Sequence, residues 1–107
     1  MSLNALIIKT LEPLGVPVDF QTYPGDATTY ITFFEFNQRS AVTADDVEKR
    51  TAHSIQVDIW SLSDYSDLTS SVKMALIENG FVRSMETEMF EEDTGYFHKV
   101  LRFNYVQ

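Results

Sequence analysis

The chain has 107 residues, of which 44% are hydrophobic and none is cysteine. This length suits one domain with a modest core, and the lack of cysteine excludes disulfide bonds, Cys-ligated zinc and thiol nucleophiles. Sixteen acidic and eight basic residues give a formal charge of −8, which disfavours binding to DNA or to an anionic membrane. No apolar run approaches the ~20 residues that cross a bilayer. We expect a single domain over residues 1–107.

The first third of the chain contains a helical pattern followed by turn residues. Leucine and isoleucine recur at helical spacing over residues 3–13, which predicts an amphipathic helix that ends at Pro13 and Gly15. The next passage, "VPVDFQTYPGDAT" at 16–28, is expected to be irregular, with a turn at its Pro-Gly pair. The β-branched and aromatic run "YITFFEFN" at 30–37 predicts a strand.

A second strand is predicted at 54–61, "SIQVDIWS". Ile55, Val57 and Ile59 fall on one face, and the alternate side chains are expected to face water. The intervening segment at 38–53 is polar and charged. We expect it to be a 16-residue loop, longer than the two to five residues usual in hairpins, and such loops are often functional or mobile.

The second half begins with a helix, for which Ser63 or Asp64 is the expected cap and Asn79-Gly80 the stop. Two more strands are predicted at 82–92 and 96–106. The resulting order is helix, strand, strand, helix, strand, strand. It predicts an α+β fold with a four-stranded, mainly antiparallel sheet and two helices packed on one face.

The tripeptide Asp93-Thr94-Gly95 matches the signature around the catalytic aspartate of aspartic proteases. In those enzymes two aspartates share one proton, whereas Glu91 and Glu92 beside Asp93 would add like charges at the site. A three-residue hairpin loop with glycine third explains the same residues. We therefore expect a turn at 93–95.

This loop would also set the register of the last two strands. The expected cross-strand pairs are Met85 with Phe103 and Thr87 with Leu101 on one face, and Glu86 with Arg102 on the other.

No other group of residues predicts chemistry. Asp58, Asp64 and Asp67 lack the spacing and the glycine of a calcium loop, so we expect a solvated strand face, a helix cap and a first-turn acid. His53 and His98 have no second histidine at ligand spacing, and His98 is expected to be an exposed strand residue, able to pair with a carboxylate across the hairpin. Glycine-rich phosphate loops and Gly-x-Ser-x-Gly elbows are absent from the sequence. We expect no catalytic residue, metal site or cofactor.

Two further features have more than one interpretation. Trp60 is expected in the core, and the alternative is an anchor at a protein interface. The end of the last hairpin is acidic. We expect this tip to be solvated and to discourage edge-strand pairing, and the alternative is a docking surface for a basic partner. The acidic residues are Glu86, Glu88, Glu91, Glu92 and Asp93.

The second half resembles the small tail-completion, or head-to-tail joining, proteins of long-tailed phages and prophages of Gram-positive bacteria. The resemblance rests on "SIQVDIWSLSDYSDLTSSVKMALIENGF" and "EEDTGYFHKVLRFNY" and covers residues 54–106. The first half matches mainly in the order of its elements. The matching features are Asp58-Ile59-Trp60-Ser61, Asp64-Tyr65, Asn79-Gly80-Phe81 and His98-Lys99.

The resemblance implies a structural virion protein at the head–tail interface, made in the host cytoplasm, without catalytic residues. Members resemble tail terminators, which form a ring, commonly a hexamer, on the tail tube. The implied partners are further copies of the chain, which can be monomeric before assembly, the tail-tube protein and head-completion proteins. Sequence-specific nucleic-acid binding and membrane binding are not implied. We expect the 38–53 segment to reach a neighbouring subunit, through Gln38, Arg39, Asp45, Asp46, Lys49, Arg50 and His53.

Two other functions stay open from the sequence. A small ligand-binding or regulatory α+β module that dimerises would have an apolar pocket with a few polar groups. A hydrolase using Asp93 or His98 would lose activity on Asp93→Asn.

Overall fold

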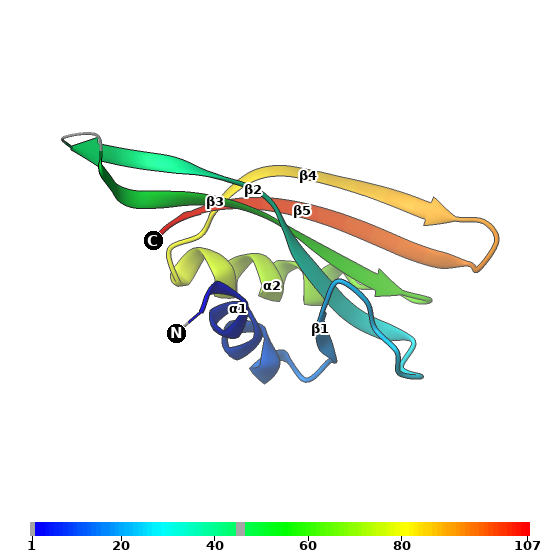
Figure 1. Ribbon diagram of the computed structural model, residues 1–107. Coiled ribbons are helices and arrows are strands. Elements are labelled where there is room, and N and C mark those ends of the chain that lie inside the picture. The colour runs from blue at the N-terminus through cyan, green and yellow to red at the C-terminus, as the bar shows by residue number, and fades with distance from the viewer. Residues whose placement is uncertain (1, 45–46) are drawn as a thin grey trace.

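The computed structural model describes the backbone of residues 2–44 and 47–107, and the side chains of 2–39 and 50–107. Two helices and five strands follow one another along the chain (Figure 1). They are α1 (Leu3–Leu11) with a following turn of 3₁₀ helix η1 (Glu12–Leu14), β1 (Val18–Phe20), β2 (Thr29–Ala44), β3 (Val47–Ser61), α2 (Ser66–Glu78), β4 (Val82–Glu91) and β5 (Tyr96–Val106).

The strands form one five-stranded sheet in the order β1-β2-β3-β5-β4. The pair β1–β2 is parallel, and the other three pairs are antiparallel. The predicted four-stranded, mainly antiparallel sheet is therefore wrong: the sheet is mixed, and the element order is α-β-β-β-α-β-β.

The strand that the sequence analysis missed is β1. It has only three residues, inside the passage expected to be irregular, and it pairs Val18 with Ile31 and Phe20 with Phe33. Three residues are too short to show an alternating pattern, and a parallel partner is set by tertiary packing rather than by a local turn. The strand ends at Gln21, which has a positive φ of 63°. Its backbone N–H donates to the carbonyl oxygen of Phe33, so the left-handed conformation is held by the sheet.

The predicted loop at 38–53 is also wrong. Most of this segment extends β2 and β3, whose pairing runs from Thr29↔Ser61 to Ala44↔Val47 with register shifts along the way. The sequence did not predict these strands, because this polar and charged segment has no alternation of apolar and polar residues. Of the expected loop, Asp45 and Asp46 lie outside the described residues.

Both helices cover the same side of the sheet (Figure 1), as expected. The core between them is apolar and contains the predicted row from β3. Its fully buried members include Ile7, Leu11, Phe33, Ile55, Val57, Ile59, Val72, Leu76, Phe81, Leu101 and Phe103. Burial of these side chains from water is the main stabilising contribution to the fold.

The end of α2 agrees with the prediction, and its start differs from it. The N-cap residue is Tyr65, which makes no side-chain capping hydrogen bond, rather than Ser63 or Asp64. Asp64 Oδ1 accepts hydrogen bonds from the backbone N–H and the hydroxyl of Ser66, which lowers the pKa of Asp64. At the other end Gly80 takes φ 92°, and the N–H of Phe81 donates back to the carbonyl of Leu76, as in a glycine-terminated helix.

The last hairpin forms, with a different register from the predicted one. Glu91 pairs with Tyr96, so the loop has four residues, 92–95, with Gly95 at φ 77°. The partner of Glu86 is therefore Leu101 rather than Arg102. The extra loop residue shifts every pair by one position, and an irregularity between Arg83 and Met85 shifts the register again.

In the part of the chain that the structure describes, neither helix has the length and hydrophobicity needed to span a membrane.

Candidate assembly surface

The molecule is elongated, with extents of 52 × 26 × 24 Å. One end is the far part of the β2–β3 hairpin, which we call the arm (residues 39–44 and 47–52), and the other end is the β4–β5 loop (Figure 1). Beyond Thr51 and Ala52, which also pair with the end of β5, the arm has two strands only. On one side β1 reaches no further than Phe33, and on the other β5 pairs with β3 only as far as Ala52↔Val106. A free two-stranded ribbon is at best marginally stable in water, which makes the arm a candidate for contact with another molecule.

The base of the arm is fixed by polar contacts. His53 is buried, and its Nδ1 contacts the carboxylate of Glu35 and lies 3.3 Å from Nε2 of Gln38. The backbones of Thr51 and Gln107 exchange two hydrogen bonds, of 2.9 and 3.1 Å. These contacts hold the direction in which the arm leaves the sheet.

The expected interface residues divide between the base and the shaft of the arm. Gln38 and His53 form a cross-strand pair at the base, where His53 is buried. Arg39 and Arg50 lie on opposite strands, two register positions apart, and both are exposed. Lys49 lies in β3, while Asp45 and Asp46 are outside the described residues. Thus, of the expected residues with described side chains, Gln38 and the two arginines are exposed and His53 is not.

The face of the sheet away from the helices contains a buried acid–base pair that the sequence analysis placed in solvent. Asp58 and His98 are 4% and 7% exposed, and Oδ1 of Asp58 lies 2.8 Å from Nε2 of His98. Gln56 also donates to this oxygen. The expectation of a solvated Asp58 and an exposed His98 is wrong, because large neighbouring side chains on the same face cover both groups.

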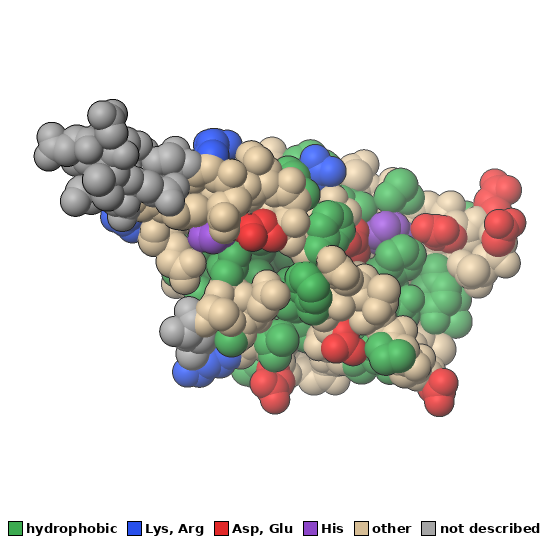
Figure 2. Space-filling model, in the orientation of Figure 1, with side chains coloured by type: hydrophobic (Ala, Val, Ile, Leu, Met, Phe, Trp, Pro, Cys, Tyr) green, Lys and Arg blue, Asp and Glu red, His purple; other side chains and the backbone are tan. Residues whose placement is uncertain are grey.

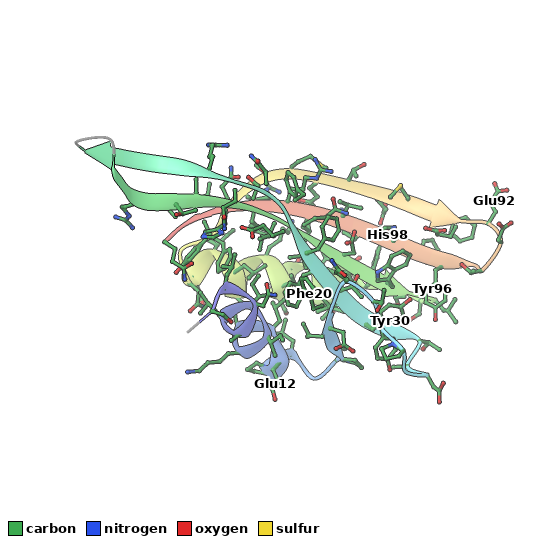
Figure 3. The ribbon with its side chains drawn as sticks, in the orientation of Figure 1. Glu12, Phe20, Tyr30, Glu92, Tyr96 and His98 are labelled. Carbon is green, nitrogen blue, oxygen red and sulfur yellow. The ribbon has the colours of Figure 1, made fainter. Side chains whose placement is uncertain are left out.

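Aromatic rings provide that cover, in a row across three strands. The ring of Trp60 stacks on His98 at 3.7 Å between centroids, and its Nε1 donates to the hydroxyl of Thr32. Tyr30 lies beside Trp60, and burial, together with the neighbouring Tyr96, raises the pKa of Tyr30. Figure 3 shows Tyr30, Tyr96 and His98 gathered over this part of the sheet. Trp60 therefore packs on the open face, not in the core under the helices.

Glu86 is the centre of a charged cluster on the opposite, helix-covered face. Its carboxylate contacts Lys99 at 2.9 Å, Lys73 of α2 at 3.3 Å, and Arg83. The pKa of Glu86 is lowered to about 2, and the hydrogen bond from Lys99 contributes most to this shift. Glu88, next along this face, accepts a 2.7 Å hydrogen bond from the hydroxyl of Tyr65. Of the five acidic residues expected at a solvated tip, Glu86 is instead part of this cluster, while Glu88 is exposed and also binds Tyr65.

The remaining tip acids, Glu91, Glu92 and Asp93, are exposed at the β4–β5 loop. Red side chains mark this end in Figure 2, and Glu92 projects from it in Figure 3. Among the described residues, no Lys or Arg nitrogen lies within ion-pair distance of these three carboxylates.

The same end of the molecule exposes aromatic rings. Phe90 and Phe97 are 55% and 40% exposed, with ring centroids 5.1 Å apart. They lie on the helix side of the hairpin, where the sheet extends past the start of α2. We call this part of the hairpin, around Phe90 and Phe97, the overhang. A groove of about 340 Å³ opens beneath this overhang, lined by Ser63, Asp64, Tyr65, Ser66, Glu88 and Phe97. The overhang therefore combines an apolar wall with an acidic rim.

The described residues include no cluster of three or more His, Asp and Glu side chains able to hold a metal ion. Asp93 lies in the exposed hairpin loop rather than in a buried site, so it lacks the environment in which an aspartic protease acts. The groove is lined by serines, an acid pair and aromatic rings.

Comparisons with known proteins bear on the fold. No protein-family model and no curated protein sequence matches the chain. Among solved structures, a chain from the virion of a native gene transfer agent particle is similar, with a TM-score of 0.57 and 14% identity. The alignment covers 95% of this chain and 84% of that one. The fold of this chain is therefore similar, over most of its length, to that of a chain in this gene transfer agent virion.

Proposed function

We propose that the chain is a structural virion protein of a long-tailed phage or prophage, which joins or terminates the tail tube at the head–tail interface. The observation that carries the proposal is the fold shared with a gene transfer agent virion chain over 95% of the residues. The sequence resemblance to tail-completion proteins, over residues 54–106, supports the same role independently. Residues 1–107 form the single domain that performs it.

The proposed form is a ring of copies, six as in the resembling family, that caps the tail tube. The free two-stranded arm supports self-assembly, because the ordering of such a ribbon is favoured when it packs on a neighbour. The partners are other copies, the tail-tube protein and head-completion proteins. An acidic surface would let DNA pass through the opening without adhering. The role requires no cofactor, metal ion or catalytic residue.

The first test is the mass in solution, measured by light scattering after size exclusion over a range of concentrations. We expect a species near six times the 12.3 kDa chain mass, and negative-stain images of rings with a central opening. Protein that stays monomeric when concentrated should still be found in purified tailed particles of its source. A monomer that is also absent from such particles would contradict the proposal.

A small regulatory module that dimerises is the second candidate. The groove under the β4–β5 overhang favours it, since it is open and combines apolar and polar walls. A tight dimer at every concentration, with a metabolite bound in native mass spectrometry, would support this candidate over the ring.

A further inference from the structure

We propose that the arm of one copy docks into the overhang groove of the next, with Arg39 and Arg50 against the acidic β4–β5 loop. This inference rests on the ring assembly proposed above and identifies the two surfaces that meet. The arm and the overhang lie at opposite ends of a molecule 52 Å long. Contact between opposite ends is heterologous, so each copy gives its arm to one neighbour and receives an arm from the other.

Charge complementarity selects these two surfaces. The other described cations of the sheet and α2 are engaged: Lys73, Arg83 and Lys99 surround Glu86, and the guanidinium of Arg102 lies 4.4 Å from the ring centre of Phe36. The exposed arginines of the arm are therefore the cations that a neighbour can reach on this part of the molecule. The loop at the other end offers Glu92 and Asp93, which have no ion-pair partner among the described residues, whereas Glu91 lies 3.6 Å from Nδ1 of His98.

The aromatic rings of the overhang also provide a surface on which an arginine can stack. Phe97 lines the groove together with Asp64 and Glu88, and the exposed ring of Phe90 lies next to that of Phe97. A guanidinium stacks on aromatic rings while it donates to carboxylates. A two-stranded ribbon is about 5 Å wide between strand axes, which allows an arm to lie along the overhang.

A larger groove, of about 410 Å³, lies between α2 and β4 and is the competing receptor for the arm. It is lined by Ser70, Lys73, Met74, Ile77, Glu78 and Arg83. Lys73 and Arg83 in this groove would repel the arginines of the arm, so it is the poorer receptor. It therefore serves as the control site in the cross-linking experiment below.

Charge reversal tests the contact. The arm variant carries Arg39→Glu and Arg50→Glu, and the loop variant carries Glu92→Lys and Asp93→Lys. In an assembly of either variant alone, like charges would face each other at every contact. We therefore expect light scattering to show no assembled species for either variant alone. An equimolar mixture opposes unlike charges at every contact of an alternating ring, and we expect it to recover the wild-type mass. Glu12→Lys with Glu78→Lys makes the same change in net charge as the loop variant, away from both surfaces, and should assemble like the wild type.

Cross-linking provides the second measurement, because the wild-type chain has no cysteine. Ser40→Cys in the arm and Ser63→Cys in the groove are prepared as separate chains and mixed under oxidising conditions. We expect a disulfide-linked dimer from the mixture and little from either chain alone. Ser40→Cys mixed with Ser70→Cys, in the α2–β4 groove, should give at least tenfold less.

The outcomes separate the inference from the function on which it rests. Wild-type rings without the 40–63 cross-link, or a variant mixture that stays dissociated, would overturn the inference and leave the ring intact. The cross-link in open filaments would support the contact and contradict the closed ring. Wild-type protein that neither self-associates nor cross-links would overturn both.

Discussion

The acidic residues differ in whether their carboxylates are paired with other side chains, and only the paired ones are expected to stabilise the fold. Glu86 and Asp58 each hold several donors, whereas the exposed acids of the β4–β5 loop hold no Lys or Arg within the described chain. Substitutions at the first two should therefore change stability, and substitutions at the loop should not.

Glu86→Gln should change the acid sensitivity of the fold. The pKa of Glu86 is lowered from 4.5 to about 2, so its ionised form stabilises the folded state above pH 4.5. This contribution is lost as the pH falls from about 4.5 to 2. We expect Glu86→Gln to lower the free energy of unfolding by about 1 to 2 kcal/mol at pH 7, since partial exposure screens the interaction. The loss should shrink toward pH 2.

Urea denaturation followed by circular dichroism across this pH range checks the prediction. Glu92→Gln, in the exposed loop, is the matched control and should leave the profile close to wild type. A Glu86→Gln variant with wild-type stability at pH 7 would show that the cluster around Glu86 is not stabilising.

Asp58→Ala should destabilise the fold by about 2 to 4 kcal/mol, because it leaves His98 and Gln56 without their acceptor in a buried position. Asp26→Ala, at an exposed loop position, should change stability by no more than about 0.5 kcal/mol. Thermal unfolding of the two variants beside the wild type measures the difference. Equal melting temperatures for Asp58→Ala and wild type would mean that water replaces the lost carboxylate.

At the scale of elements, the helices and the long strands differ in how far sequence alone could predict them. The helices and the core row of β3 follow from apolar periodicity, and the stop at Gly80 follows from its left-handed backbone. The arm strands, β1 and the hairpin register could not be predicted in the same way. Their placement depends on partners distant in sequence, such as Ile31 for Val18, or on one additional loop residue.

The candidate surface was predictable to a similar extent. Arg39 and Arg50 were identified because they are charged residues in an uninterrupted polar segment. The burial of His53 and His98 was not predictable, since it results from aromatic and polar neighbours that the sheet brings together. Exposure of Phe90 and Phe97 follows from where α2 begins relative to β4 and β5, and no local pattern encodes it.

Shortening the arm should separate assembly from folding. Replacing residues 41–50 by Asn-Gly joins Ser40 to Thr51, which already face each other across the ladder, through a favoured two-residue turn. The removed segment lies beyond the pairing of β3 with β5, which reaches Ala52↔Val106, and beyond that of β1 with β2, so we expect the free energy of unfolding to change by less than about 1 kcal/mol. Denaturation should show an intact fold, and light scattering should show a monomer where the wild type assembles. A shortened chain that still forms rings would exclude the arm from the contact.

At the scale of the whole molecule, the charge of −8 is unevenly distributed. The described cations lie mainly on the arm, in the Glu86 cluster and against Phe36. Residues 91–95, at the β4–β5 end, include three acidic residues and no Lys or Arg. This polarity along a 52 Å axis supports head-to-tail contacts between copies and opposes contacts between like ends.

The same charge predicts poor affinity for duplex DNA. Non-specific binding arises from cations that neutralise phosphates, and its dissociation constants are about 10⁻⁴ to 10⁻⁶ M at physiological salt. We expect the anisotropy of a labelled 30-base-pair duplex to stay unchanged with up to about 50 µM protein under those conditions. Saturable, salt-sensitive binding at micromolar concentration would show a basic patch that the described surface lacks, and would exclude passive passage of DNA through the ring.

The stack of Trp60 on His98 has a spectroscopic consequence. Trp60 is the only tryptophan of the chain, and it lies on the face of the sheet that the helices leave open. Its emission therefore reports on that single face without any label. A subunit, tube protein or peptide that covers the open face would shift the emission, while one that docks only at the arm or the overhang would leave it unchanged. The protein thus carries an intrinsic probe that distinguishes contacts made through the sheet from contacts made through its two ends.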